Sequence, residues 1–319
     1  MIRPNTPRIR TVLLVLALFP QILPRTGQAA QSQNGVAGSS PIHRRKHSEW
    51  SKQVMKHVFT EHRRTNEFLG AFPKNQQLFD SVRCVFSDRQ FDHENFLCTL
   101  LLPHDCRTSA FAIRAFNIEV ARVQDQISDP RIGQMRLKFW EDIIESIFKN
   151  KAHKHPVALE LHRASKKHKL SKRYLKRLIT ARSNQLNISG FPDLEAMEVY
   201  SEGSVSSVYY LLLETAGVEN VHADHAASHL GKAQGISNIL RSVFHNIQHS
   251  VVALPQDVLL KHSVSHETVL RAECNKALME VFFDIANRAK QHLAKIMYSS
   301  PMASLVLTDS SQLTSDSQK

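Results

Sequence analysis

The segment that decides the fold runs from His222 to Leu260 and reads HADHAASHLGKAQGISNILRSVFHNIQHSVVALPQDVLL. Its apolar residues recur at steps of three and four, which predicts one long helix over 226–243 with a buried stripe. The stripe consists of Leu230, Ala233, Ile236, Ile239, Leu240 and Val243. Gly231 and Gly235 carry no side chain, so we expect another helix or a ligand to come close to this helix.

The letters LGKAQGISNILR, followed by LPQD, resemble the second signature of the squalene and phytoene synthases. These all-helical enzymes join two prenyl diphosphates head to head. The resemblance implies an all-α fold, an isoprenoid-synthase-like helical bundle, over residues 90–298. In active members the NILR letters lead into an acidic motif. This sequence has Ser242, His245 and Asn246 where those three acids would stand.

The stretch NFLCTLLLPHDCRTSAFAIRAFNIEVARVQD resembles the first conserved block of the same family, and its periodicity predicts an amphipathic helix over 108–123. In the family an Ala-Phe pair precedes a DDxxD motif, whose acids share one helix face and hold Mg²⁺ with the second motif. Alignment without gaps puts these acids at Ala121, Arg122 and Asp125. Only Asp125 is acidic, so we predict a pseudoenzyme with no catalytic residue, no metal ligand and no cofactor.

A vestigial cavity is the site that the resemblance leaves open. We expect it to be lined by Asp125, Asn238 and Arg241. Arg241 and Arg122 still offer guanidinium groups to a phosphate. Two alternatives therefore remain for the cavity: it binds a prenyl or lipid ligand, or it binds no ligand.

The segment GQMRLKFWEDIIESIF, residues 133–148, predicts a strong helix with Leu137, Trp140, Ile144 and Ile147 in the core. It resembles the branch of the family that includes a mitochondrial factor for assembly of respiratory complex I. The resemblance implies a non-catalytic role in building NADH:ubiquinone oxidoreductase. The implied partners are complex I subunits or other assembly factors, at the matrix face of the inner membrane. The alternative is an active head-to-head prenyl transferase.

The first 48 residues contain seven Lys or Arg and no acid. Together with the Gln/Ser/Gly/Ala-rich linker over residues 27–40, this is typical of a mitochondrial presequence. The apolar run over 12–19, with small residues at 27–30, also fits a secretory signal, so secretion remains the alternative. Residues 49–319 hold 34 bases against 29 acids. The high net charge thus belongs largely to the leader and gives no reason to expect a nucleic-acid partner.

The remaining boundaries follow from composition. We expect a variable helical extension over 49–89 and a disordered or non-family tail over 299–319, where serines are frequent and helical periodicity ends. The family normally continues with further helices, so the bundle is expected to be shortened at its C-terminus. No apolar run approaches the roughly 20 residues of a membrane span.

A basic run without any acid lies between Glu160 and Asp193, and Ser171 is placed to cap a helix within it. Such a run is either a solvated helix face or a surface for an anionic membrane or an acidic partner. The residues predicted for that surface are Lys166, Lys167, Lys169, Lys172, Arg173, Lys176 and Arg177.

The segment HADHAASH raises the question of a metal site, because His222, His225 and His229 recur at helical spacing. A tetrahedral site needs a fourth ligand, which the sequence does not offer nearby. We therefore predict no metal here. Asp224 is expected to cap the start of the helix.

Overall fold

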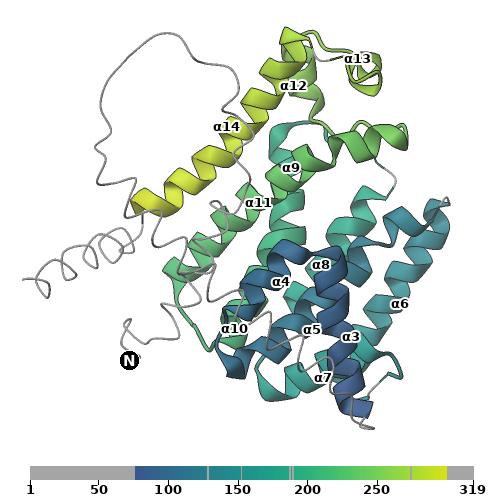
Figure 1. Ribbon diagram of the computed structural model, residues 1–319, viewed down its shortest axis with the longest axis vertical. Helices are drawn as coiled ribbons and strands as arrows, with labels where there is room; N and C mark the ends of the chain where they lie inside the picture. Colours follow the sequence, from purple (N-terminus) through teal and green to yellow (C-terminus); the bar gives the residue numbers. More distant parts are fainter. Residues whose placement is uncertain are drawn as a thin grey trace, which may run out of the picture. The chain divides into compact units, whose positions relative to one another are not determined.

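The computed structural model describes residues 76–299, except residues 128, 152, 187, 189 and 274. Within these residues every named element is a helix, which confirms the all-α prediction (Figure 1). The predicted presequence and linker over 1–48, residues 49–75 of the extension, and the tail beyond residue 299 lie outside the described residues.

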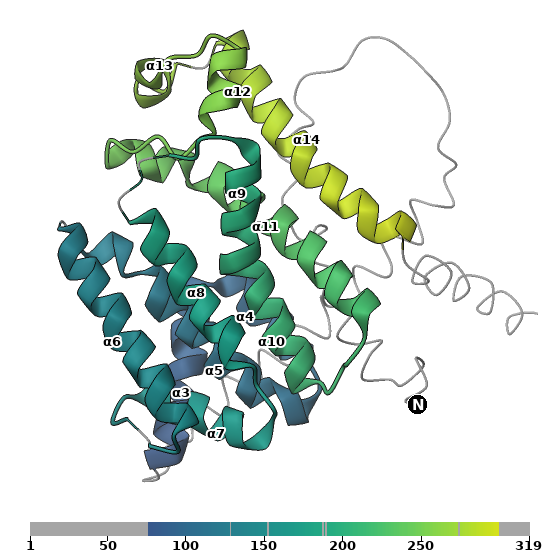
Figure 2. The ribbon, with the colours of Figure 1, turned by 180° about the vertical axis from the view of Figure 1, so that it is seen from behind.

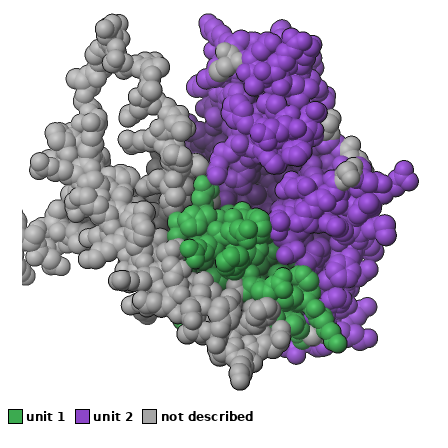
Figure 3. Space-filling view, turned by 45° about the vertical axis from the view of Figure 1, so that its right-hand side comes forward, with its two compact units in different colours: residues 1–118, 154–164 green, residues 119–153, 165–319 purple. Residues whose placement is uncertain are grey.

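The chain forms two compact units (Figure 3). The first comprises Met1–Ile118 and Lys154–Ala164. Its helices are α3 (Gln76–Phe91), α4 (His93–Leu100), most of α5 (His104–Ala121) and most of α7 (Pro156–Lys167). The sequence boundary at residues 89 and 90 thus falls inside α3.

The first unit is built on aromatic and aliphatic side chains of α4 and α5. Phe96, Ile113 and Phe116 are fully or almost fully buried, and the rings of Phe96 and Phe111 lie 5.8 Å apart. The same interior also buries charged groups. Asp88 is 0% exposed, and neither of its carboxylate oxygens has a hydrogen-bond partner. Burial raises the pKa of Asp88 well above its ordinary value, against the opposing effect of Arg114.

The second unit comprises Glu119–His153 and Ser165–Lys319. Its described helices, besides the ends of α5 and α7, are η1 (Gln124–Gln126), α6 (Pro130–Phe148), α8 (Lys172–Gln185), α9 (Leu194–Ser201), the π-helix η2 (Glu202–Ser206), α10 (Ser207–Thr215), α11 (Val221–Gln248), α12 (Gln256–Lys261), α13 (His266–Leu270) and α14 (Lys276–Ser299).

Helices α6 and α8 run side by side (Figures 1 and 2). Helix α6 begins three residues before the predicted range 133–148. Pro130 occupies its first turn, and the Asp129 side chain accepts a hydrogen bond from Arg131 N at 2.9 Å. The predicted core residues of α6 are confirmed as buried, namely Leu137, Trp140, Ile144 and Ile147. Ser171 precedes α8 as predicted, but its side chain makes no capping hydrogen bond. Instead, Ser171 N donates to Glu214 Oε2 at 2.8 Å.

The long helix predicted over 226–243 is confirmed as the centre of α11. It begins earlier than expected, because Asn220 caps it by accepting hydrogen bonds from His222 N and Ala223 N. The prediction that Asp224 caps the helix is therefore wrong: Asp224 lies inside the first turn. The buried face of α11 packs into a core that includes Leu254, Val258, Val281 and Ile285, so α11 and α14 lie against each other.

Candidate functional site

The polar interior of the second unit begins at the π-helix η2, which interrupts the path from α9 to α10. Single π turns are rare and often occur at functional positions. At Gly231 of α11 an added Cβ would lie 2.5 Å from Ser206 Cα, and at Gly235 it would lie 3.0 Å from Ser201 Cα. The expected close approach to α11 is thus confirmed, and the approaching segment is α9 with η2. Ser206 Oγ donates across it to Ser228 O at 3.1 Å.

Glu202 stands at the first position of η2 and collects hydrogen bonds there. Tyr210 OH donates to its Oε1 at 2.7 Å, and Ser228 Oγ donates to its Oε2 at 2.8 Å. Arg177 Nη2 lies 3.5 Å from the same carboxylate. Burial raises the pKa of Glu202, but hydrogen bonds from Tyr210, Ser228 and Ser206 outweigh it, and the pKa ends below its ordinary value. Glu202 is therefore held as a carboxylate.

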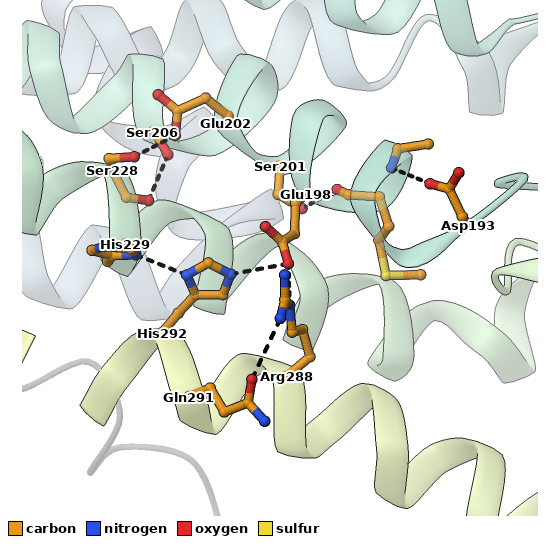
Figure 4. Close-up of polar contacts among 12 residues, drawn as sticks. Asp193, Glu198, Ser201, Glu202, Ser206, Ser228, His229, Arg288, Gln291 and His292 are labelled. Carbon is orange, nitrogen blue, oxygen red and sulfur yellow. Dashed lines mark hydrogen bonds and ion pairs between the residues drawn. The ribbon is translucent and has the colours of Figure 1, made fainter. Parts of the chain in front are cut away.

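A second carboxylate, Glu198 of α9, joins α9 to α14. It accepts a hydrogen bond from Arg288 Nε, and its Oε1 lies 3.3 Å from His292 Nε2 (Figure 4). Glu198 is 8% exposed and His292 is 3% exposed. Burial alone would raise the pKa of Glu198, but Arg288 and His292 lower it below its ordinary value.

The network continues from α14 to α11 through two imidazole rings. The Nδ1 atoms of His292 and His229 lie 2.8 Å apart. His292 Nε2 is the ring nitrogen that lies toward the Glu198 carboxylate; in the tautomer with the proton on that nitrogen, His292 Nδ1 accepts and His229 Nδ1 donates. Burial, and then the neighbouring His292, lower the pKa of His229 to about 4. Burial also lowers the pKa of His292, although Glu198 opposes it. Both rings are therefore neutral at pH 7.

The residues predicted to line a vestigial cavity lie on two elements. Asp125 is exposed on η1, whereas Asn238 and Arg241 are exposed on α11. Asn238 and Arg241 are three residues apart and share a helix face. The positions that the family fills with acids make other contacts here: Asn246 Nδ2 donates to Ser242 Oγ at 3.1 Å, and the His245 ring lies against His249.

Several residues of the predicted basic surface are engaged within the protein. Lys172 Nζ and Lys176 Nζ lie 2.6 Å and 2.7 Å from the carboxylate of Glu145 on α6, and these contacts lower the pKa of Glu145 to about 2. Arg177 contacts Glu202, as described above, and Arg173 lies over the ring of Tyr174 at 4.7 Å. The remaining members, Lys166, Lys167 and Lys169, are exposed.

The three histidines of HADHAASH do not converge on one point in the way that a metal site requires. His222 and His225 are exposed, while His229 turns to His292. Among the described residues no group of three or more His, Cys, Asp or Glu side chains is placed to hold a metal ion. Over the same part of the chain no helix has the length and apolar character to cross a membrane.

Comparison with known sequences explains the arrangement of these helices. Residues 88–302 match the squalene/phytoene synthase family. The chain belongs to this family. Two solved squalene/phytoene synthase structures share its fold, which confirms the isoprenoid-synthase-like bundle. A dehydrosqualene synthase superposes with a TM-score of 0.61 at 17% identity, covering 70% of this chain and 78% of its own. A squalene synthase from Alicyclobacillus acidocaldarius gives 0.62 at 16%, with 73% and 88% covered.

More similar members of the family carry a different name. Proteins called NADH dehydrogenase (ubiquinone) complex I, assembly factor 6, are 44% identical in Rattus norvegicus and 42% identical in Homo sapiens over 210 residues. A homolog in Drosophila melanogaster is 41% identical over 222 residues, 67% of this chain and 66% of its own. The match covers 66% of this chain, which spans 63% of the length of the rat and human relatives.

The sequence did not point to Glu198, Arg288 or His292, the residues that join α9, α11 and α14. One signal was present. His292 follows Val281, Ile285 and Ala289 at steps of four, four and three, so it extends the apolar face of α14. A histidine at such a position needs a buried polar partner.

Proposed function

We propose that this chain is a non-catalytic mitochondrial protein that assists the assembly of respiratory complex I, a pseudoenzyme of the squalene/phytoene synthase family. The observation that carries the proposal is the loss of acids at the two signature motifs. A serine–asparagine hydrogen bond and a histidine pair occupy the second motif, and Ala121 and Arg122 stand in the first. The names of the more similar relatives support the assembly role.

The chemistry of prenyl transfer explains why the loss matters. Mg²⁺ demands near-octahedral oxygen ligation, and a diphosphate leaving group needs its charge neutralised by bound metal. Asp125 alone supplies too few oxygen ligands. We expect purified protein, given Mg²⁺ and farnesyl or geranylgeranyl diphosphate, to release no diphosphate, while an active squalene synthase assayed in parallel does. Turnover at a rate comparable with that enzyme would favour the prenyl transferase alternative.

The assembly role is tested in cells depleted of their own complex I assembly factor 6. We expect this chain to restore fully assembled complex I, measured on native gels together with NADH oxidation. A chain lacking residues 1–48 should remain outside mitochondria and fail to restore it, because those residues carry the basic, acid-free signal. A secreted, glycosylated product would contradict the proposal, as would normal complex I levels in the depleted cells.

We further propose peripheral attachment to the matrix face of the inner membrane. The exposed basic residues at the end of α7 and the start of α8 support it, because cations near an anionic surface contribute about 1 kcal/mol each and are screened over about 8 Å at physiological salt. We expect high salt or alkaline carbonate to release the protein from membranes. The variant K166Q/K167Q/K169Q/R173Q should bind more weakly without loss of fold. Unchanged membrane binding of this variant would show that these residues form only a solvated helix face.

A ligand retained in the old cavity is a separate part of the proposal. Arg241 and Asn238 share one face of α11, and a guanidinium suits a phosphate head group. Mass spectrometry of the purified protein should detect a bound prenyl or phospholipid species, and Arg241→Ala should lower its amount. Equal lipid content in the two proteins would remove Arg241 from the site.

A further inference from the structure

The N-terminal half of α6 exposes a stripe of large apolar side chains. Ile132, Met135 and Phe139 are 49%, 72% and 48% exposed. With 3.6 residues per turn they fall within an arc of roughly 60° on the helix. The opposite face of α6 carries the buried Leu137 and Ile144, so the stripe is additional to the core-facing side. A continuous exposed apolar stripe marks an interaction surface.

Basic side chains border the stripe on both edges. Arg131 and Lys138 lie along one edge and Arg136 along the other, by helical spacing. Arg131 has a side chain that is 92% exposed, with Asp129 as its nearby acid at 4.0 Å. Arg136 donates to the Gln126 side chain at 3.1 Å, and this partner carries no negative charge.

The C-terminal half of α6 differs in charge. Its Glu141 and Asp142 lie 2.8 Å and 3.7 Å from Lys138 Nζ and compensate that lysine. Glu141 and Glu145 also contact the lysines of α8. Positive charge next to apolar surface is thus concentrated in the first two to three turns of α6.

Helix α14 offers a matched comparison within the same unit. Met279 and Phe283 are 52% and 65% exposed and are four residues apart, as are Met135 and Phe139. On α14, however, Glu280 and Asp284 directly follow these two residues in the chain. On α6, Arg136 directly follows Met135 and Lys138 directly precedes Phe139. The apolar pair is therefore beside acids on α14 and beside bases on α6.

We propose that the N-terminal half of α6 inserts into the surface of an anionic membrane. Ile132, Met135 and Phe139 enter the boundary between head groups and acyl chains, while Arg131 and Arg136 bind lipid phosphates. The stripe lies on one face of a single helix, and long arginine stems can extend from an apolar face to the head groups, as in other interfacial helices. This rests on the proposed peripheral attachment and assigns its apolar part to α6.

The α6 surface can be separated from the α7–α8 basic residues by mutation. Lys172 and Lys176, near the start of α8, contact Glu145 and Glu141 near the end of α6, so the two helices are antiparallel. The start of α6 and the start of α8 therefore lie at opposite ends of this helix pair. A variant at one end leaves the other end intact.

The test is cosedimentation of the full chain with vesicles of phosphatidylcholine, with or without phosphatidylglycerol. We expect the parent to bind the anionic vesicles and M135S/F139S to bind at least about tenfold more weakly, because apolar surface no longer leaves water. The matched control M279S/F283S should bind like the parent. Binding of M135S/F139S at the parent's level would overturn the proposal, as would an equal loss in M279S/F283S. Absence of binding of the parent to anionic vesicles would also overturn the proposal, and the stripe would then be a surface for a protein partner.

Two further measurements keep the result independent of folding. R131Q/R136Q retains the stripe, and we expect it to lose binding several-fold on anionic vesicles only. Brominated lipid should quench the fluorescence of the tryptophan introduced in Met135→Trp, but not of the one introduced in Met279→Trp. The reverse would overturn the proposal. Vesicles contain no complex I. Restored complex I assembly without vesicle binding would overturn this proposal alone, and vesicle binding through α6 without restored assembly would overturn the assembly role alone.

Discussion

The surroundings of two buried carboxylates, Glu198 and Asp88, shift their pKa values in opposite directions. Glu198 accepts a hydrogen bond from Arg288 and contacts His292, and its pKa is lowered. Asp88 has no hydrogen-bond partner on either oxygen, and burial raises its pKa. Burial depth is therefore a poor guide to what a charged group contributes, since 8% and 0% exposure accompany opposite shifts. For these two residues the difference lies in the donors, since Arg288 and His292 reach Glu198 and outweigh its burial, whereas no hydrogen bond reaches the carboxylate of Asp88.

The largest effect is expected from removing the close approach between α11 and η2, the turn that follows Glu198 and α9. In Gly231→Val, the new side chain would meet the backbone of Ser206, which cannot move aside as a flexible side chain can. We expect a loss of about 3 kcal/mol in the free energy of unfolding, measured by urea denaturation. Lys232→Val adds the same β-branched residue at the next position and should cost under about 1 kcal/mol. Equal losses would assign the effect to helix propensity.

Removing the carboxylate itself should cost less. Glu198→Ala leaves Arg288 and the buried His292 without their acceptor, and we expect a loss of about 2 kcal/mol, reduced from that of a fully buried pair because Arg288 is partly exposed. In the double variant E198A/R288A part of that loss should be recovered, which a double-mutant cycle measures. Strictly additive losses would mean that the two side chains do not act as a pair.

Asp88 should respond in the opposite direction. Because its folded pKa is raised, the folded chain must keep a proton that the unfolded chain releases, so its contribution becomes unfavourable as pH rises above the unfolded pKa near 4. We expect Asp88→Asn to stabilise the protein by about 1 kcal/mol at pH 7 and to make little difference at pH 3.5. Destabilisation at pH 7 would mean that Asp88 is ionised and balances Arg114.

At neutral pH the smallest effect is expected from the histidine pair, because its contribution changes only at lower pH. The pKa of His229 is lowered to about 4, so the unfolded chain binds a proton that the folded chain does not. Stability should fall as pH drops from about 6.5 towards 4, where unfolded histidine is protonated first. His229→Gln should flatten this part of the profile of urea midpoint against pH and leave the midpoint at pH 8 little changed. An unaltered profile would place the titration on another group.

Most of the fold could be predicted from patterns of residues that are close together in the sequence. The apolar period of α11 and α6 and the small residues Gly231 and Gly235 can be recognised over a few turns of helix, since they depend on residues near in sequence. The start of α6 at Pro130 was not predicted, although a proline in the first turn is a local signal. The N-cap of α11 could not be predicted in this way, because the side chains of Asn220 and Asp224 can both accept capping hydrogen bonds. Only the path of the backbone decides which of them does so. The network of Glu198, Arg288 and His292 spans about ninety residues of chain. Sequence identifies the face on which His292 lies but not the carboxylate opposite it.

The π turn at η2 gives this region a specific response to the loss of one residue. Its five residues follow i→i+5 bonding, so the segment carries one residue more than an α-helix needs. An in-frame loss of the Val205 codon would remove that extra residue, and the segment would wind as a regular α-helix with the faces of α9 and α10 in the same relative orientation. Glu198 would then still face α14. Loss of one codon inside α10 has no extra residue to remove and would rotate the two sides of the cut by about 100°, so alleles of that kind should be the more damaging.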